Sequence, residues 1–244
     1  MLLCYKSSMI KKKSVEKMNL KTKITKFLSL SKSLILFGLI VLSACTEAPK
    51  KETRVNLPFI GHHDIVYEAT DDYNVGDTIF HTVPNWEYLT HDSVMLNAKS
   101  INDKVWIVDF FFSYCPTICP PMTHAMRGVN DSLKAYKDEL NFLSFSIDPD
   151  RDTPKRLRLY RKRHEITAEN WFFLTGNEAE THKLGLDGFQ LLANADKNAP
   201  GGYAHSPNFV LVDKNQHIRG VYDGLDAASR KQLIIDAKKL LDAN

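Results

Sequence analysis

An almost unbroken apolar run at residues 105–112, Val-Trp-Ile-Val-Asp-Phe-Phe-Phe, constrains the fold of this chain more than any other feature. A strand that is apolar on both sides is expected at the centre of a sheet whose two faces are covered. Residues 142–147 and 171–175 have the same apolar character and are predicted to be further strands. Because a segment with helical signals follows each of these runs, the chain is predicted to be an α/β protein.

The segments between the strands carry those helical signals. Between residues 121 and 139, apolar side chains recur at spacings of 4, 3, 4 and 3, which describes one face of a helix. A second helix is expected to begin at Pro154, with Thr153 or Asp152 as its N-cap, and a short third helix is expected over 178–184.

Two hairpins and a last helix complete the expected elements. Residues 86–90 and 94–97 predict one hairpin, and residues 209–213 and 217–222 predict another. Residues 229–241 are expected to form a closing amphipathic helix.

This order of elements joins a βαβ unit to a ββα unit, with a pair of cysteines at the first strand-to-helix turn. That combination is typical of thioredoxin-like proteins. The predicted fold class is therefore α/β, a thioredoxin-like central sheet flanked by helices, with an extra N-terminal β-hairpin.

The N-terminal region predicts export and a lipid anchor. Several lysines precede a short apolar run at 34–42, which is followed by Ser43-Ala44-Cys45. This is the order of a secretory signal, and the run is too short to span a bilayer. The residues up to Cys45 also resemble a bacterial lipobox, although a plain cleaved signal or an uncleaved anchor remain alternatives. We therefore expect an extracytoplasmic protein, on the periplasmic side, attached to a membrane through a lipid on Cys45.

These signals divide the chain into three parts. Residues 1–44 are predicted to be the signal peptide with its lipobox, with Met18 as an alternative start. Residues 45–58 are polar and aperiodic and are predicted to be a tether. Residues 59–244 are predicted to be the folded domain.

Charge is distributed unevenly along the chain, and this excludes nucleic acid as a partner. The net charge of +3 hides nine lysines and one glutamate in residues 1–44. The remaining 200 residues carry 23 basic and 28 acidic groups. A protein that binds nucleic acid is expected to carry its positive charge in the folded part.

Only two cysteines are left for the folded domain. Cys4 lies in the predicted signal and Cys45 is assigned to the lipid, which leaves Cys115 and Cys119. A single close pair is not a disulfide scaffold and instead indicates a site. The pair lies where the central strand meets a helix N-terminus, whose dipole favours thiolate.

Spacing alone leaves two interpretations of this pair equally open. Two thiolates suit Cu(I), and an added imidazole lets a site hold Cu(II) as well. Structural zinc normally needs four ligands. A structural disulfide between Cys115 and Cys119 is the other interpretation.

Three motifs in order resemble the Sco/SenC family, over about Trp86 to Tyr222. They are Cys-Pro-Thr-Ile-Cys-Pro at 115–120, Ile-Asp-Pro-Asp-Arg-Asp-Thr-Pro at 147–154, and Tyr-Ala-His-Ser at 203–206, ahead of an apolar strand. Members of that family are copper chaperones for assembly of the CuA centre of cytochrome c oxidase. The resemblance implies copper, as Cu(I) or Cu(II), as the bound metal.

Carried over by position, the metal ligands are Cys115, Cys119 and His205. The chain departs from the common family pattern at Thr117-Ile118 and at Ala204. Neither departure falls on a ligand, so the implied metal site is complete.

Other residues near these motifs are not predicted to be metal ligands. His62, His63 and His124 are expected to be ordinary surface or core residues rather than ligands. Asp148 is expected to be structural, with ligand orientation or partner contact as the alternative. Pro207 stands where thioredoxin-like folds have a cis-proline, and we predict a cis Ser206–Pro207 bond that aims His205 at the sulfurs.

The leading functional hypothesis is a metallochaperone that delivers copper to, or matures, the CuA-bearing subunit of cytochrome c oxidase. The alternative is an enzyme, a thiol–disulfide oxidoreductase acting through Cys115 and Cys119 on periplasmic or oxidase cysteines. His205 discriminates between them, since a reductase does not need it. A third possibility is a binding lipoprotein with an inert disulfide. A peroxiredoxin is disfavoured because its cysteine motif does not precede Cys115.

Overall fold

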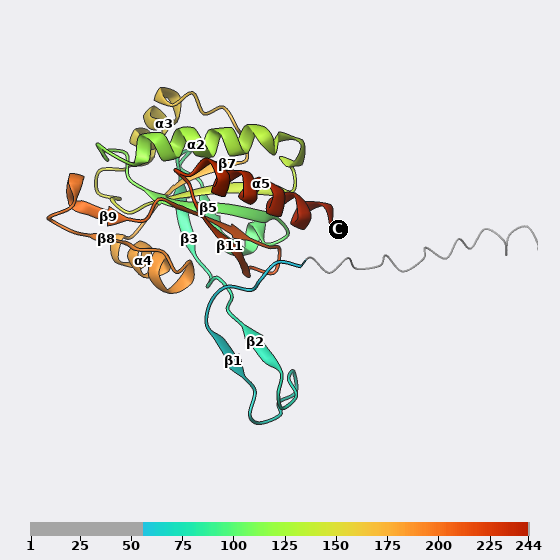
Figure 1. Cartoon of the computed structure of the whole chain (residues 1–244). Coiled ribbons are helices and arrows are strands. Elements are labelled where there is room, and N and C mark those ends of the chain that lie inside the picture. Colours follow the sequence, from blue (N-terminus) through green and yellow to red (C-terminus); the bar gives the residue numbers. More distant parts are fainter. Residues whose placement is uncertain (1–55, 244) are drawn as a thin grey trace, which may run out of the picture. The chain divides into compact units, whose positions relative to one another are not determined.

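The computed structural model describes residues 56–243, in which the main sheet has seven strands (Figure 1). In spatial order these are β11 (Ile218–Asp223), β10 (Asn208–Val212), β5 (Val105–Phe111), β6 (Leu140–Ser146), β7 (Trp171–Thr175), β3 (Glu87–Thr90) and β4 (Met95–Asn97). β5, β6 and β7 are parallel to one another, and the remaining neighbours pair antiparallel. This is the predicted α/β architecture with a parallel centre.

The centre of the sheet explains why the apolar runs predicted strands so well. Every residue of β5 and of β6 is buried, as expected for strands covered on both faces. The predicted hairpin at 86–97 forms as β3 and β4 and extends the sheet edge next to β7.

Within residues 56–243, four α-helices and four shorter helical turns accompany the strands. The helices are α2 (Cys119–Ser132), α3 (Pro154–Arg163), α4 (Glu178–Lys183) and α5 (Ala227–Asp242). The turns are η1 (Ala98–Ile101), η2 (Lys134–Tyr136), η3 (Leu184–Gly188) and η4 (Pro200–Gly202).

Aromatic side chains join helices to both faces of the sheet. On one face Phe111 of β5 contacts Tyr160 of α3, whose hydroxyl bonds Thr123 of α2 at 2.7 Å. On the other face Phe110 contacts Phe189, just after η3, at 5.6 Å between ring centroids. Figure 1 shows α2 and α5 side by side on the first of these faces. The core therefore lies on both sides of β5, the strand that leads into the cysteine pair.

Helix α2 begins earlier than its periodicity predicts. The apolar period predicts a helix from residue 121, but Cys119 is itself the first helical residue. Pro120 and Pro121 occupy the first turn, where the N–H that proline lacks would have no intrahelical partner. The second cysteine is therefore held by regular helix.

Two small sheets were not predicted from the sequence. β1 (His63–Ile65) pairs with β2 (Thr78–Phe80), and β8 (Ala193–Ala195) pairs with β9 (Tyr203–His205). The second hairpin gives defined structure to residues 193–205.

The predicted cis bond before Pro207 is wrong, because none of the peptide bonds within residues 56–243 is cis. An X–Pro bond normally prefers trans. Here Ser206 continues from β9, and its N–H donates to the Leu192 carbonyl at 3.0 Å. The extended chain delivers His205 without a sharp turn.

The first described residues are attached at the end of the sheet opposite the cysteines. Arg219 of β11 donates to the carbonyls of Leu57 and Pro58 at 2.8 and 3.1 Å. Ile60 pairs with Ile218, which lies beside Val212 and thus near the start of β5. Cys115 follows the other end of β5, so chain entry and cysteine pair occupy opposite ends.

The predicted signal, the lipobox and Cys45 lie outside the described residues. Among the helices of residues 56–243, none is both long and apolar enough to cross a membrane.

Candidate metal centre

The two cysteines sit where β5 ends and α2 begins. Cys115 lies in the connecting loop, and its N–H donates to the Phe112 carbonyl at 3.2 Å. Cys119 is the first residue of α2 and is 1% exposed. Both are free thiols, so a disulfide between them is not formed in this structure.

His205 reaches the cysteines from the other side of the loop. It ends β9, and its Nε2 lies 3.2 Å from Cys119 Sγ. Its Nδ1 lies 3.2 Å from the Ser206 carbonyl oxygen, which can only accept, so Nδ1 carries the proton. The lone pair of Nε2 is therefore free to bind a metal.

The sequence-predicted ligands therefore come together. One ligand atom from each of Cys115, Cys119 and His205 lies within 4.8 Å of the other two, and all three residues are buried. Among the described residues no other group of His, Cys, Asp or Glu forms such a cluster. His62, His63 and His124 take no part in it, as expected.

The two thiols differ strongly in acidity. The pKa of Cys115 falls to about 3, chiefly because its sulfur accepts a hydrogen bond from the Cys119 thiol, with smaller help from His205. Burial is the main reason that the pKa of Cys119 is strongly raised, and the neighbouring Cys115 thiolate, which holds the Cys119 proton in a hydrogen bond, raises it further. At neutral pH the pair thus holds one thiolate, on Cys115, and one proton, on Cys119.

Such a site suits a soft metal ion. Two sulfurs and one imidazole nitrogen match Cu(I), and the nitrogen extends the range to Cu(II). Zinc would need a fourth ligand, which the described residues do not supply next to this cluster.

A buried carboxylate fixes the loop before Cys115. Asp152 Oδ2 accepts from the Ser113 N–H at 2.9 Å and from Ser146 Oγ at 2.7 Å. Thr153, the other candidate, caps α3 by accepting from the Arg156 N–H. The sequence indicates Asp152 only as a possible cap of α3, and nothing local to its motif points to Ser113, which is 39 residues away.

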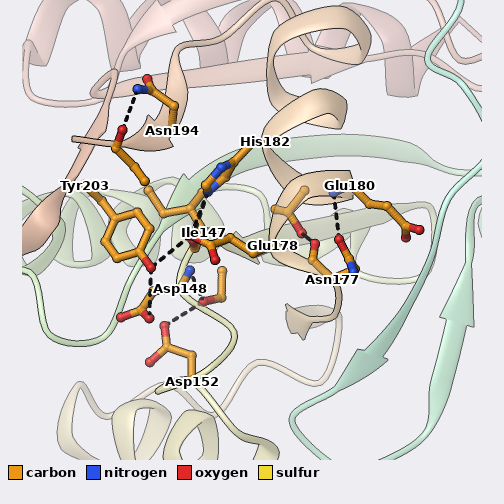
Figure 2. Close-up of polar contacts among 12 residues, drawn as sticks. Ile147, Asp148, Asp152, Asn177, Glu178, Glu180, His182, Asn194 and Tyr203 are labelled. Carbon is orange, nitrogen blue, oxygen red and sulfur yellow. Dashed lines mark hydrogen bonds and ion pairs between the residues drawn. The ribbon is translucent and has the colours of Figure 1, made fainter. Parts of the chain in front are cut away.

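Tyr203 fastens the hairpin that carries His205. Figure 2 shows its hydroxyl between Asp148 and Glu178, to which it donates over 3.4 and 3.1 Å. Its ring packs on Phe112 at 5.3 Å, and His205 contacts the same ring at 5.8 Å. Because residues two apart in a strand share a face, holding Tyr203 also holds His205. In the sequence, Tyr203 stands out only as part of the Tyr-Ala-His-Ser motif, and no local pattern predicts this role.

Asp148 belongs to this fastening rather than to the metal cluster. It is 1% exposed, forms an ion pair with Arg151, and receives the Tyr203 hydroxyl. Next to it, His182 Nε2 lies 3.0 Å from the Ile147 carbonyl (Figure 2). The structural interpretation of Asp148 is therefore the one the contacts support.

Known proteins share this architecture. The chain is similar to a SCO1/SenC family lipoprotein from Bacillus anthracis, with 32% identity, a TM-score of 0.61, and coverage of 66% of this chain and 95% of that one. BsSco, a member of the Sco family of cytochrome c oxidase assembly proteins in which a disulfide switch was identified, shows 28% identity and a TM-score of 0.60 over 67% and 95% of the two chains.

Two further comparisons extend the likeness. The SCO1 protein homolog of Bacillus subtilis is 29% identical over 171 residues, which are 70% of this chain and 88% of that protein. Bradyrhizobium japonicum ScoI, solved with copper bound, shares the fold at 19% identity and a TM-score of 0.55, over 65% and 99% of the two chains. The SCO1/SenC family model matches residues 77–242, more than half of the chain. The chain belongs to the SCO1/SenC family.

Proposed function

We propose that this chain is an extracytoplasmic copper metallochaperone that delivers copper to, or matures, the CuA centre of cytochrome c oxidase. Cys115, Cys119 and His205 are the proposed ligands. The observation that carries the proposal is the convergence of their three ligand atoms within 4.8 Å in a buried site. Family membership supports it, as do the oxidase-assembly role stated for BsSco and the copper bound to Bradyrhizobium ScoI.

Copper titration of the reduced full-length chain, purified in detergent, tests the metal assignment. We expect one copper per chain. Cys115→Ser and Cys119→Ser should each weaken binding on the order of 100-fold, because one thiolate with one imidazole is a poor site for Cu(I). The matched control is His124→Ala, a histidine in α2 outside the cluster, which should bind like the wild type. Full affinity in both serine variants would exclude these ligands.

A thiol–disulfide oxidoreductase remains the second candidate, because Cys115 is a thiolate beside a protonated partner. A thiolate is the attacking species in disulfide exchange. His205→Ala separates the two functions. This variant should bind copper more weakly. If reduction is the main activity, the variant should still reduce a model disulfide at a rate close to that of the wild type.

The proposal includes a location and three parts of the chain. Residues 1–44 are the proposed signal, 45–58 the tether and 59–244 the domain, with a lipid on Cys45. The lipoprotein description of the Bacillus anthracis relative supports this. Fractionation of cells expressing Cys45→Ala tests the anchor, since we expect release from membranes or stalled processing. Unchanged processing and membrane association in this variant would contradict a lipid anchor.

A further inference from the structure

Helix α3 carries a concentration of positive charge that the copper site does not use. Its ten residues include six basic side chains and no acidic one. Outside α3, the rest of residues 45–244 carries 17 basic and 28 acidic groups, so the helix opposes the net charge of its own domain. These six are Lys155, Arg156, Arg158, Arg161, Lys162 and Arg163.

Acidic groups offset these charges only in part within the part of the chain that the structure describes, where Asp92 attracts Arg161 without forming an ion pair with it. None of the ion pairs there involves a side chain of α3. The three arginines that are held bond uncharged acceptors: Arg156 bonds Ser113 Oγ, Arg158 the His91 carbonyl, and Arg161 the carbonyls of Trp171 and Ala168. These hydrogen bonds hold the arginine side chains in place, and the positive charge of α3 can still attract an acidic partner.

The helix dipole accounts for only half of this charge. Basic residues in the last turn stabilise a helix, which explains Arg161, Lys162 and Arg163. Lys155 and Arg156 lie in the first turn, where the dipole disfavours cations. Their presence therefore calls for a reason outside the helix itself.

The first turn of α3 lies against the cysteine loop. Arg156 Nε donates to Ser113 Oγ at 2.9 Å, and its guanidinium lies 4.1 Å from the centre of the Tyr114 ring. Tyr114 immediately precedes Cys115 and is 48% exposed. On α3, Leu159 is 53% exposed and lies at helical spacing from Lys155 and Lys162. We call this surface the basic face; it consists of Tyr114, Lys155, Arg156, Arg158, Leu159 and Lys162.

We propose that the basic face docks the protein that receives the copper, through an acidic surface beside the receiving site on the CuA-bearing domain of the oxidase. This inference rests on the proposed function. Opposite charges steer encounter and fix orientation, and an exposed tyrosine and leucine supply apolar contact. The arrangement would bring the partner's metal-binding groups next to Cys115.

The position of the face favours a protein partner over a lipid surface. The chain enters the domain at the opposite end of the sheet, where Ile60 pairs with Ile218. A partner that receives copper from Cys115 need not reach that end. The first turn of α3, which is part of the basic face, instead lies at the end of the sheet where Cys115 follows β5.

Charge reversal of two exposed lysines tests the proposal without touching the metal site. The variant is Lys155→Glu with Lys162→Glu, two side chains that make no ion pair among the described residues. The matched control is Lys134→Glu with Lys137→Glu, an equal charge change at η2 and the residue after it. The full-length chain in detergent, free of copper, is titrated with the copper-free soluble CuA domain of the oxidase from the same organism, at about 20 mM and about 200 mM salt.

We expect wild-type affinity to fall as salt rises, because charges on the surface are screened. The basic-face variant should bind about tenfold more weakly at low salt and lose most of its salt dependence, whereas the control should stay within about twofold of wild type. Absence of wild-type binding at low salt, or equal binding by wild type and basic-face variant, would overturn the proposal. So would binding to phosphatidylglycerol vesicles, abolished by the same variant, in place of binding to the domain.

The same preparations separate this inference from the proposed function. Each is also titrated with copper, and the two lysine variants should bind it like the wild type. A wild-type chain that docks as expected but takes up no copper would refute the copper function and leave the basic face as a docking surface. Copper uptake without charge-dependent docking would refute the docking surface and leave the copper function in place.

Discussion

At the residue scale, the site depends on two thiols with opposite acidities. Cys115 faces the loop and is stabilised as a thiolate, whereas Cys119 is buried at the start of α2 and keeps its proton. One negative charge is less costly to bury than two, so the metal-free pair keeps one thiolate and one protonated thiol. A metal ion that displaces the Cys119 proton gains the second sulfur and His205 Nε2 together.

This difference predicts the pH dependence of the thiolate. Because the pKa of Cys115 is lowered to about 3, its thiolate is present above that pH and is lost as the pH falls through it. Ultraviolet absorbance of the reduced, copper-free chain should therefore show one thiolate per chain from neutral pH down to about pH 4. Cys115→Ser should remove this signal at pH 7. A midpoint near 8 or 9, as for an ordinary cysteine, would contradict the assignment.

At the element scale, two structures hold the ligands at the end of the sheet. The β5–α2 junction supplies both cysteines, and Asp152 ties the intervening loop to the start of α3. The β8–β9 hairpin supplies His205, and Tyr203 ties it to Asp148 and Glu178. The strength of the second tie should appear in the copper affinity, because His205 lies on the hairpin it holds.

Tyr203→Phe removes that tie and keeps the ring on Phe112. A hydrogen bond of this kind is worth about 1 kcal/mol, so copper should bind about fivefold more weakly if the hairpin is loosened. Tyr222→Phe is the matched control, since the Tyr222 hydroxyl also bonds a carboxylate, Asp236, at 3.0 Å and outside the cluster. Competition titration against a copper chelator measures both variants. If Tyr203→Phe and Tyr222→Phe bind copper equally well and lose the same stability in urea, Tyr203 contributes to folding alone.

The same elements show what the sequence could and could not predict. β5 and β6 were predictable because burial on both faces leaves a nearly unbroken apolar run in β5 and a mostly apolar one in β6. β8 and β9 were not, because three-residue strands made of small and polar residues, such as Ala193–Ala195, carry no recognisable period. Helix α2 starts before the predicted boundary because the first turn of a helix tolerates Pro120 and Pro121.

In the site, too, some residues could be predicted from the sequence and others could not. Cys115, Cys119 and His205 could be proposed because the resemblance places them by motif, and the structure brings them together. Asp152 and Tyr203 could not be assigned their roles, since each acts on a residue more than twenty positions away. The cis bond at Pro207 was predicted by analogy with a fold and is trans here.

At the scale of the whole domain, attachment and metal binding occupy opposite ends of one sheet. Arg219 fastens Leu57 and Pro58 near the start of β5, and the cysteines follow its other end. A domain arranged this way presents its metal site, and the first turn of the basic face, away from the point where the chain enters. This arrangement suits transfer of a metal ion to a partner, provided that the three proposed residues hold the ion.

X-ray absorption spectroscopy of the copper-loaded chain tests that condition most directly. The account predicts a copper ion bound by two sulfurs and one imidazole nitrogen in the wild type. His205→Ala should keep both sulfurs and lose the nitrogen, whereas His124→Ala should leave the spectrum unchanged. A first shell without two sulfurs, or an imidazole contribution that persists in His205→Ala, would contradict the claim that Cys115, Cys119 and His205 form the copper site.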